Sequence, residues 1–123
     1  MKDYVFVRDG NPDDVPRPQD PVAAKAAVRT QIEATSTWFR AHRVFGVFVA
    51  GVRRDDGDLA ADVAFHGHSE DLTNLFARAV AELLHACTTG MPPRDRFDAA
   101  IDHLKAMNVK TIAAFVELLG EDA

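Results

Sequence analysis

Cysteine is almost absent from this chain of 123 residues, which contains only Cys87. A single cysteine excludes a framework of disulfide bonds within the chain. The sequence also lacks an apolar run long enough to cross a bilayer as a helix, and its first residues, Met1-Lys2-Asp3-Tyr4, do not have the pattern of a signal peptide. We therefore expect a cytoplasmic protein that does not associate with membranes.

Basic residues are outnumbered by acidic ones, 14 Lys and Arg against 19 Asp and Glu, for a formal net charge of −5. Nonspecific binding to nucleic acid depends on a basic surface, so no nucleic-acid partner is expected. The sequence has no glycine-rich phosphate loop, no nucleophile-elbow serine and no Glu-x-x-His pair. We accordingly predict no catalytic residue, no metal ligand and no cofactor, and a role that is more consistent with binding than with catalysis.

What the chain does contain is typical of a folded soluble protein, with 47% apolar and 27% charged residues. Its length suits one domain, residues 1–123. Tyr4-Val5-Phe6-Val7 predicts a short edge strand, and the proline- and aspartate-rich stretch 9–20 predicts an irregular loop.

The centre of the sequence predicts a β-hairpin followed by a helix. Residues 44–52 include no polar side chain, so both faces of a strand there are apolar and need cover. Asp56-Gly57 predicts the turn. In the return strand, residues 59–65, one face is strongly apolar and is expected to be core, whereas the opposite face is less apolar. The strongly apolar face consists of Leu59, Ala61, Val63 and Phe65.

Helical spacing of apolar residues marks the remaining elements. Asp20-Pro21 opens a helix that runs to about His42, with a stripe of Val28, Ile32, Thr35 and Phe39. Ser69 is expected to cap a second helix that ends before a left-handed Gly90. Residues 94–119 form either one further helix or two. The predicted fold class is α+β, a small three-stranded antiparallel sheet (N-terminal strand plus central hairpin) packed by three or four helices.

One candidate site for a small anion follows from the predicted hairpin register, which places Val47 opposite His66. This register brings the end of the first helix beside the start of the second, whose free N–H groups and dipole favour anions. The alternative is that Arg40 and Arg43, at the end of the first helix, pair with Glu70 and Asp71 on a solvated surface. The predicted anion-binding residues are Arg40, His42, Arg43, His66, His68 and Ser69.

The histidines also raise the question of a metal. His66-Gly67-His68 places two imidazoles on one face if the strand continues, and His42 is a candidate third ligand. The pattern is weak because no other cysteine or histidine stands at a metal-binding spacing, and Cys87 is expected to be buried as a small apolar residue.

The surplus of apolar surface favours an interaction protein. A small domain with a strand that is apolar on both faces has difficulty covering all of its apolar residues alone, and a symmetric homodimer is the commonest outcome. Trp38 fits either core packing or an interface, and Phe45 and Phe48 are the other interface candidates. The excess of Ala, Arg and Asp is typical of GC-rich bacterial or phage genomes.

The predicted function is a non-enzymatic, self-associating regulatory or inhibitor-type protein that binds another macromolecule. The alternatives are a small-molecule anion or nucleotide binder that uses the Ser69 helix start, and a metal-dependent hydrolase. The expected partners are a second copy of the chain, a protein partner or a small anionic ligand.

Overall fold

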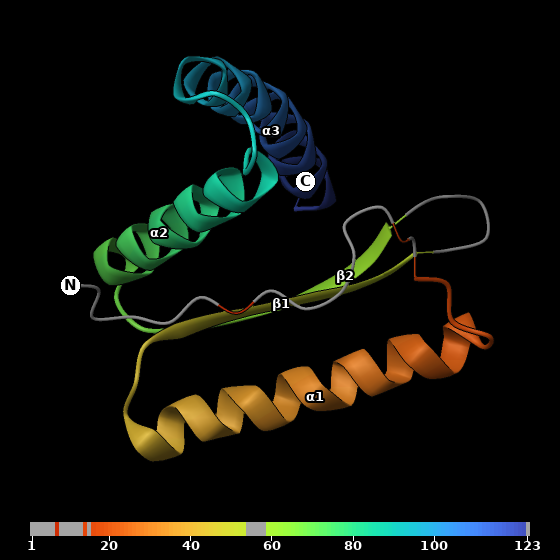
Figure 1. The fold of residues 1–123 in the computed structure, drawn as a ribbon. Helices are drawn as coiled ribbons and strands as arrows, with labels where there is room; N and C mark the ends of the chain where they lie inside the picture. Colours follow the sequence, from red (N-terminus) through yellow and green to blue (C-terminus); the bar gives the residue numbers. More distant parts are fainter. Residues whose placement is uncertain (1–6, 8–13, 15, 54–58, 123) are drawn as a thin grey trace. The chain divides into compact units, whose positions relative to one another are not determined.

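The computed structural model describes the whole chain apart from residues 1–6, 8–13, 15, 54–58 and 123. The described residues have an α+β fold, with three helices and a two-stranded antiparallel sheet (Figure 1). The chain divides into two compact units, Met1–Arg78 and Ala79–Ala123, and each is described by itself. In chain order the elements are α1 (Pro21–His42), β1 (Gly46–Arg53), β2 (Leu59–His66), α2 (Ser69–Cys87) and α3 (Pro93–Glu121).

Helix α1 begins and ends with local signals that its sequence carries. The side chain of Asp20 accepts a hydrogen bond of 3.1 Å from the N–H of Ala23, and Pro21 stands in the first turn, as predicted. The helix ends at Arg43, which has a left-handed backbone with φ 54°. The N–H of Val44 then donates to the carbonyl of Phe39 at 3.1 Å, which satisfies one of the last carbonyls of the helix.

Strands β1 and β2 form a regular antiparallel hairpin whose pairs run from Gly46 with His66 to Arg53 with Leu59. The predicted register was wrong by one residue, because Val47 lies opposite Phe65 and not opposite His66. A turn centred on Asp56-Gly57 requires an even number of residues between the paired strands. In the structure, five residues, 54–58, separate them. That odd number shifts the pairing by one. The Asp56-Gly57 turn itself lies outside the described residues.

The predicted third strand, Tyr4–Val7, also lies outside the described residues except for Val7, which belongs to no helix or strand. In the predicted loop 9–20, the described positions 14 and 16–20 form no helix or strand. The assignment of the whole chain to one domain remains a prediction.

The core of the first unit lies between α1 and one face of the hairpin. Its position corrects the sequence interpretation, because the face predicted to be core is not the one that α1 covers. A Cβ atom added to Gly46 would lie 2.5 Å from the Phe39 ring, so the backbone of β1 comes close to the helix at this point. The helix approaches the face with the smaller side chains, where close packing is sterically allowed. Among the described residues, the buried apolar ones are Ile32, Phe39, Val52, Ala60 and Ala64.

The second unit contains the end of α2, a connector and α3. Thr88 is almost fully buried, and its hydroxyl donates to the Leu84 carbonyl at 2.9 Å. Arg96 donates through Nε to the Thr88 hydroxyl at 3.2 Å and through Nη2 to the His85 carbonyl at 3.1 Å. These bonds satisfy the end of α2, and Gly90 has the predicted positive φ, 92°.

Residues 94–119 belong to a single helix, α3, which resolves the choice between one helix and two. No residue of α3 is buried. In the described part of the chain, no helix combines the length and the apolar character needed to cross a membrane.

Candidate interaction surface and groove

The face of the hairpin that points away from α1 is apolar and exposed, and we call it the bare face. Strand alternation separates it from the covered face, whose residues have the other parity. The exposed fraction is 54% for Val49, 62% for Phe65 and 70% for Leu59. The bare face consists of Val47, Val49, Gly51, Leu59, Ala61, Val63 and Phe65.

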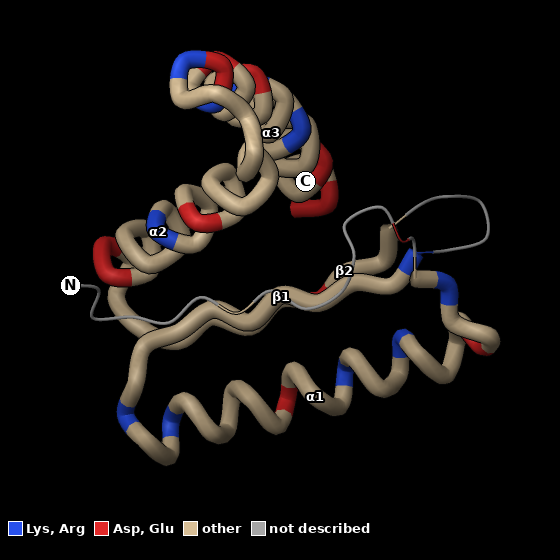
Figure 2. Tube along the Cα trace, viewed as in Figure 1, with Lys and Arg blue, Asp and Glu red and all other residues tan. Residues whose placement is uncertain are grey.

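Charged side chains are nearly absent from the two strands (Figure 2). The two exceptions among the described strand residues are Asp62, on the covered face, and Arg53, at the end of β1. Arg29 of α1 donates to the Asp62 carboxylate at 3.3 Å, and Asp62 is therefore paired on the covered side. The bare face is accordingly uncharged until Arg53.

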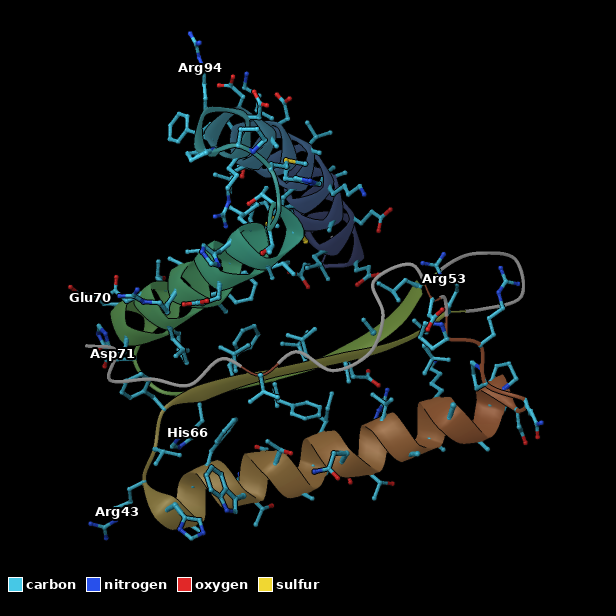
Figure 3. All side chains as sticks on the ribbon, in the orientation of Figure 1. Arg43, Arg53, His66, Glu70, Asp71 and Arg94 are labelled. Atoms are coloured by element: carbon cyan, nitrogen blue, oxygen red, sulfur yellow. The ribbon has the colours of Figure 1, made fainter. Side chains whose placement is uncertain are left out.

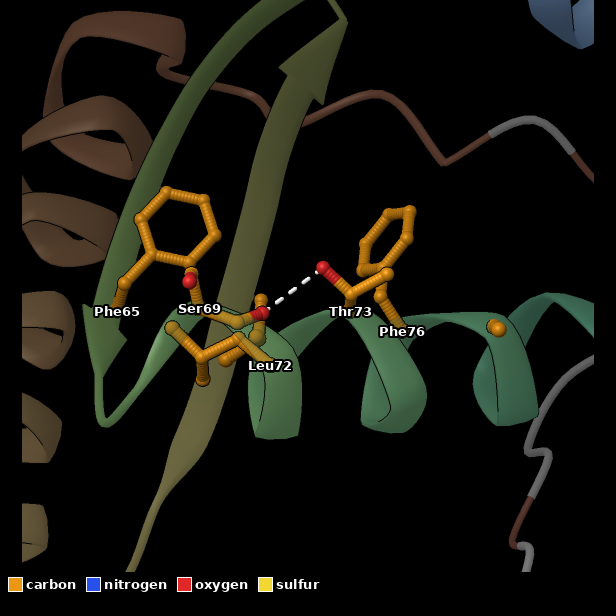
Figure 4. A pocket seen from close by; sticks show the side chains of 7 residues that line it. Phe65, Ser69, Leu72, Thr73 and Phe76 are labelled. Atoms are coloured by element: carbon orange, nitrogen blue, oxygen red, sulfur yellow. Dashed lines mark hydrogen bonds between the residues drawn. The ribbon is translucent and has the colours of Figure 1, made fainter.

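A groove of about 570 Å³ lies where the bare face meets the first turns of α2 (Figure 4). The Thr73 hydroxyl donates to the Ser69 carbonyl at 2.8 Å, so this hydroxyl is engaged within the helix. The remaining walls are mostly apolar, and the groove is therefore suited to an apolar side chain. The lining residues are Val47, Phe65, Ser69, Leu72, Thr73, Phe76 and Ala77.

Of the predicted anion-binding residues, His66 and His68 take part in local backbone contacts. His66 Nδ1 lies 2.8 Å from the carbonyl of Val44, which links the two ends of the hairpin. His68 Nδ1 accepts from the N–H of Glu70 at 3.2 Å. His68 rather than Ser69 therefore caps α2, which corrects the predicted cap by one residue.

The remaining residues of the predicted site, Arg40, His42 and Arg43, lie at the C-terminal end of α1. Arg40 Nη2 donates to the Thr37 hydroxyl at 3.4 Å, and the His42 ring lies 4.8 Å from the Trp38 ring. The Arg43 side chain points away from the hairpin (Figure 3). Among the described residues, neither arginine forms an ion pair with Glu70 or Asp71, so the alternative pairing is not present. Anion binding by these groups remains a prediction.

The three predicted interface residues have different surroundings. Trp38 is 53% exposed and its ring contacts Phe39 edge-on at 5.9 Å, so it lies on the flank of α1 and outside the core. Phe45 is 52% exposed at the start of the hairpin. Phe48 is half-buried on the side of the sheet that faces α1, because it pairs with the buried Ala64.

Cys87 is the last residue of α2 and is exposed, which corrects the expectation of burial. Within the described ranges, no three His, Cys, Asp or Glu side chains are grouped as metal ligands.

The groove was not found by sequence reasoning, although two signals bear on it. Leu72 and Phe76 are four residues apart on α2 and therefore lie on the same side of the helix. The sequence also indicates a strongly apolar face on the return strand, but that face was predicted to lie in the core.

Comparison of the chain with protein families, with characterised proteins and with solved structures gives no match.

Proposed function

We propose that this chain is a non-enzymatic interaction protein that self-associates through its bare face. The observation that carries the proposal is the exposure of the most apolar face of the hairpin. With Phe76 of the adjoining groove, its large side chains expose on the order of 500 Å² of mainly apolar area. A patch of this size is at the upper end of what monomeric proteins present to water and is typical of interaction sites.

The scarcity of polar groups around the bare face also favours binding over catalysis. The groove has few polar groups, and its Thr73 hydroxyl is already bonded within α2. A site for chemistry needs titratable or nucleophilic groups directed into a cavity. Apolar walls of this kind instead favour association with another apolar surface. Anion or nucleotide binding and metal-dependent hydrolysis are the alternative functions, and no contact among the residues that the structure describes favours either.

Sedimentation velocity of the full chain tests the proposal directly. We expect a dimer at micromolar concentration, and a chain that is monomeric at about 100 µM, a concentration at which an interface of even modest affinity is populated, would refute it.

A matched pair of valine substitutions assigns the interface. Val63→Lys places a charge at the centre of the bare face. Dimer formation would bury this charge, which is unfavourable, so the substitution should convert the dimer to a monomer. Val22→Lys introduces the same change at an 81% exposed position in the first turn of α1 and should leave the dimer intact. Circular dichroism of both variants should match that of the parent chain, since neither side chain is buried.

A further inference from the structure

We infer that two copies of the chain pack their bare faces together in antiparallel orientation. The two-fold axis lies in the interface and crosses the strands near residues 50 and 62, and Leu59 of each copy enters the groove of the other. This inference rests on the proposed self-association and adds the geometry of the interface. Three features of the first unit, namely side-chain size, the position of the groove and the position of charge, point to the same orientation.

Side-chain size in the two central rows of the bare face is self-complementary when the strands are reversed. The register pairs Val49 with Val63 and Gly51 with Ala61. The first pair forms a bulky row across the two strands, and the second pair forms a small row next to it. Antiparallel stacking places the bulky row of one copy over the small row of the other. Facing sheets pack well when large and small side chains interdigitate in this way. Parallel stacking would place the bulky rows on each other and leave a gap between the small rows.

The groove and the most exposed side chain lie at opposite ends of the bare face. Leu59 is 70% exposed at the end that leads into the 54–58 segment, and the groove adjoins Val47 and Phe65 at the other end. In the antiparallel arrangement, Leu59 of one copy lies against Phe65 of the other and projects into its groove. The groove volume of about 570 Å³ is sufficient for a leucine side chain. The contact occurs twice because the two copies are related by symmetry.

Among the described residues, a basic group and two acidic groups lie at opposite ends of the bare face, and the 54–58 segment beyond the basic end adds one arginine and three aspartates in sequence. Arg53 ends β1, whereas Glu70 and Asp71 lie in the first turn of α2 at the far end of the hairpin (Figure 3). Among the described residues, none of these three forms an ion pair. Antiparallel packing brings Arg53 of each copy to the acidic turn of the other. Parallel packing would instead bring the two arginines together, and like charges in an interface disfavour that orientation.

The available area agrees with a dimer of ordinary size. Two bare faces with their grooves contribute on the order of 1,000 Å² of apolar area, twice the value for one copy. Stable specific interfaces bury about 1,200–2,000 Å² in total, which includes a polar rim. The acidic turn of α2 and Arg53 supply such a rim here.

Charge reversal tests the orientation. Arg53→Glu should weaken the dimer about tenfold, since two rim pairs are lost and two repulsive contacts are introduced. The double variant Glu70→Lys, Asp71→Lys should weaken it similarly. When the three substitutions are combined, the dissociation constant from sedimentation equilibrium should return to within about threefold of the parent value. If the combined variant dimerises as weakly as Arg53→Glu or as the Glu70→Lys, Asp71→Lys double variant, the proposed orientation is overturned.

Crosslinking provides an independent measurement of the register. In a Cys87→Ser background, Ala61→Cys places two thiols one residue from the axis, whereas Leu59→Cys places them three residues from it and about 20 Å apart along the strands. A short bismaleimide should therefore link the Ala61→Cys chains and leave the Leu59→Cys chains unlinked. Efficient linking at Leu59→Cys would overturn the antiparallel register while self-association stands. A parent chain that sediments as a monomer would overturn both proposals.

Discussion

The two faces of the hairpin differ in an instructive way. The covered face carries mainly small residues beneath α1, among them Gly46, Ala60 and Ala64, and it also includes the larger Phe48 and the charged Asp62. The bare face carries the bulkier apolar side chains and no charge before Arg53. Helix α1 therefore covers the less apolar of the two faces. Steric fit, more than apolar content, decides where the helix packs within the chain.

This difference separates folding from association. The first unit gains its core from close contact between α1 and a face of small residues. The larger apolar side chains remain available on the other side of the same two strands. A single hairpin can thus provide a helix-packing face for the monomer and an association face for the proposed dimer. Substitutions on the two faces should accordingly change different measured quantities.

The largest expected effect comes from a substitution in the covered core. Phe39→Ala removes an 8% exposed ring from between α1 and β1, and should lower the free energy of unfolding by about 3–5 kcal/mol. Trp38→Ala alters the adjacent residue, which is 53% exposed, and should cost less than about 1 kcal/mol. Urea denaturation followed by circular dichroism measures both. Equal losses for the two variants would mean that the core is not where the structure places it.

Much of the fold could be predicted from the sequence, because its signals are local. Asp20-Pro21 identified the start of α1, and Ile32 and Phe39 identified its buried stripe. Gly90 identified the end of α2, where a positive φ is needed. Each of these signals depends on residues within one or two turns of each other, so pattern and structure agree.

The assignment of hairpin faces could not be predicted in the same way. Strand alternation places Phe65 and Ala64 on opposite faces of the hairpin. It does not determine which face α1 covers, because that depends on how the helix, distant in the sequence, fits against each face. The register failed for a related reason, since one residue in the turn length moves Val47 from His66 to Phe65.

The predicted anion site depended on that register and on side-chain directions, which sequence does not supply. His68 is used as the cap of α2, and Arg43 points away from the hairpin (Figure 3).

Two glycines on opposite faces of β1 test the role of steric fit. Gly46→Ala directs a methyl group at the Phe39 ring, 2.5 Å away, and should cost about 1–3 kcal/mol of stability. Gly51→Ala directs it at the end of the flexible Leu59 side chain, 2.9 Å away, with the Ala60 carbonyl oxygen at 3.3 Å, and should cost about 1 kcal/mol or less. Both are best measured in the Val63→Lys background, in which association should not contribute. A harmless Gly46→Ala would argue against close packing of α1.

The turn that leads from α1 into the covered face offers a stabilising substitution. Arg43 has φ 54°, a backbone conformation that favours glycine. We expect Arg43→Gly to raise the free energy of unfolding by up to about 1 kcal/mol, because the left-handed conformation no longer strains a side chain. Thermal denaturation measures the change, and Arg40→Gly, in the last turn of α1, should instead destabilise the protein. A loss of stability in Arg43→Gly would indicate that the arginine side chain makes a contact of its own.

The smallest expected effect concerns the ion pair on the covered face. Arg29 is 61% exposed at its side chain and Asp62 is 22% exposed, with 3.3 Å between Nη2 and Oδ1. Solvent screens such a pair, so a double-mutant cycle with Arg29→Ala and Asp62→Asn should give a coupling energy below about 1 kcal/mol. Added salt should reduce it further. A coupling of several kcal/mol would mean that the pair is far better shielded from water than its exposure indicates, and that charge as well as steric fit directs α1 to this face.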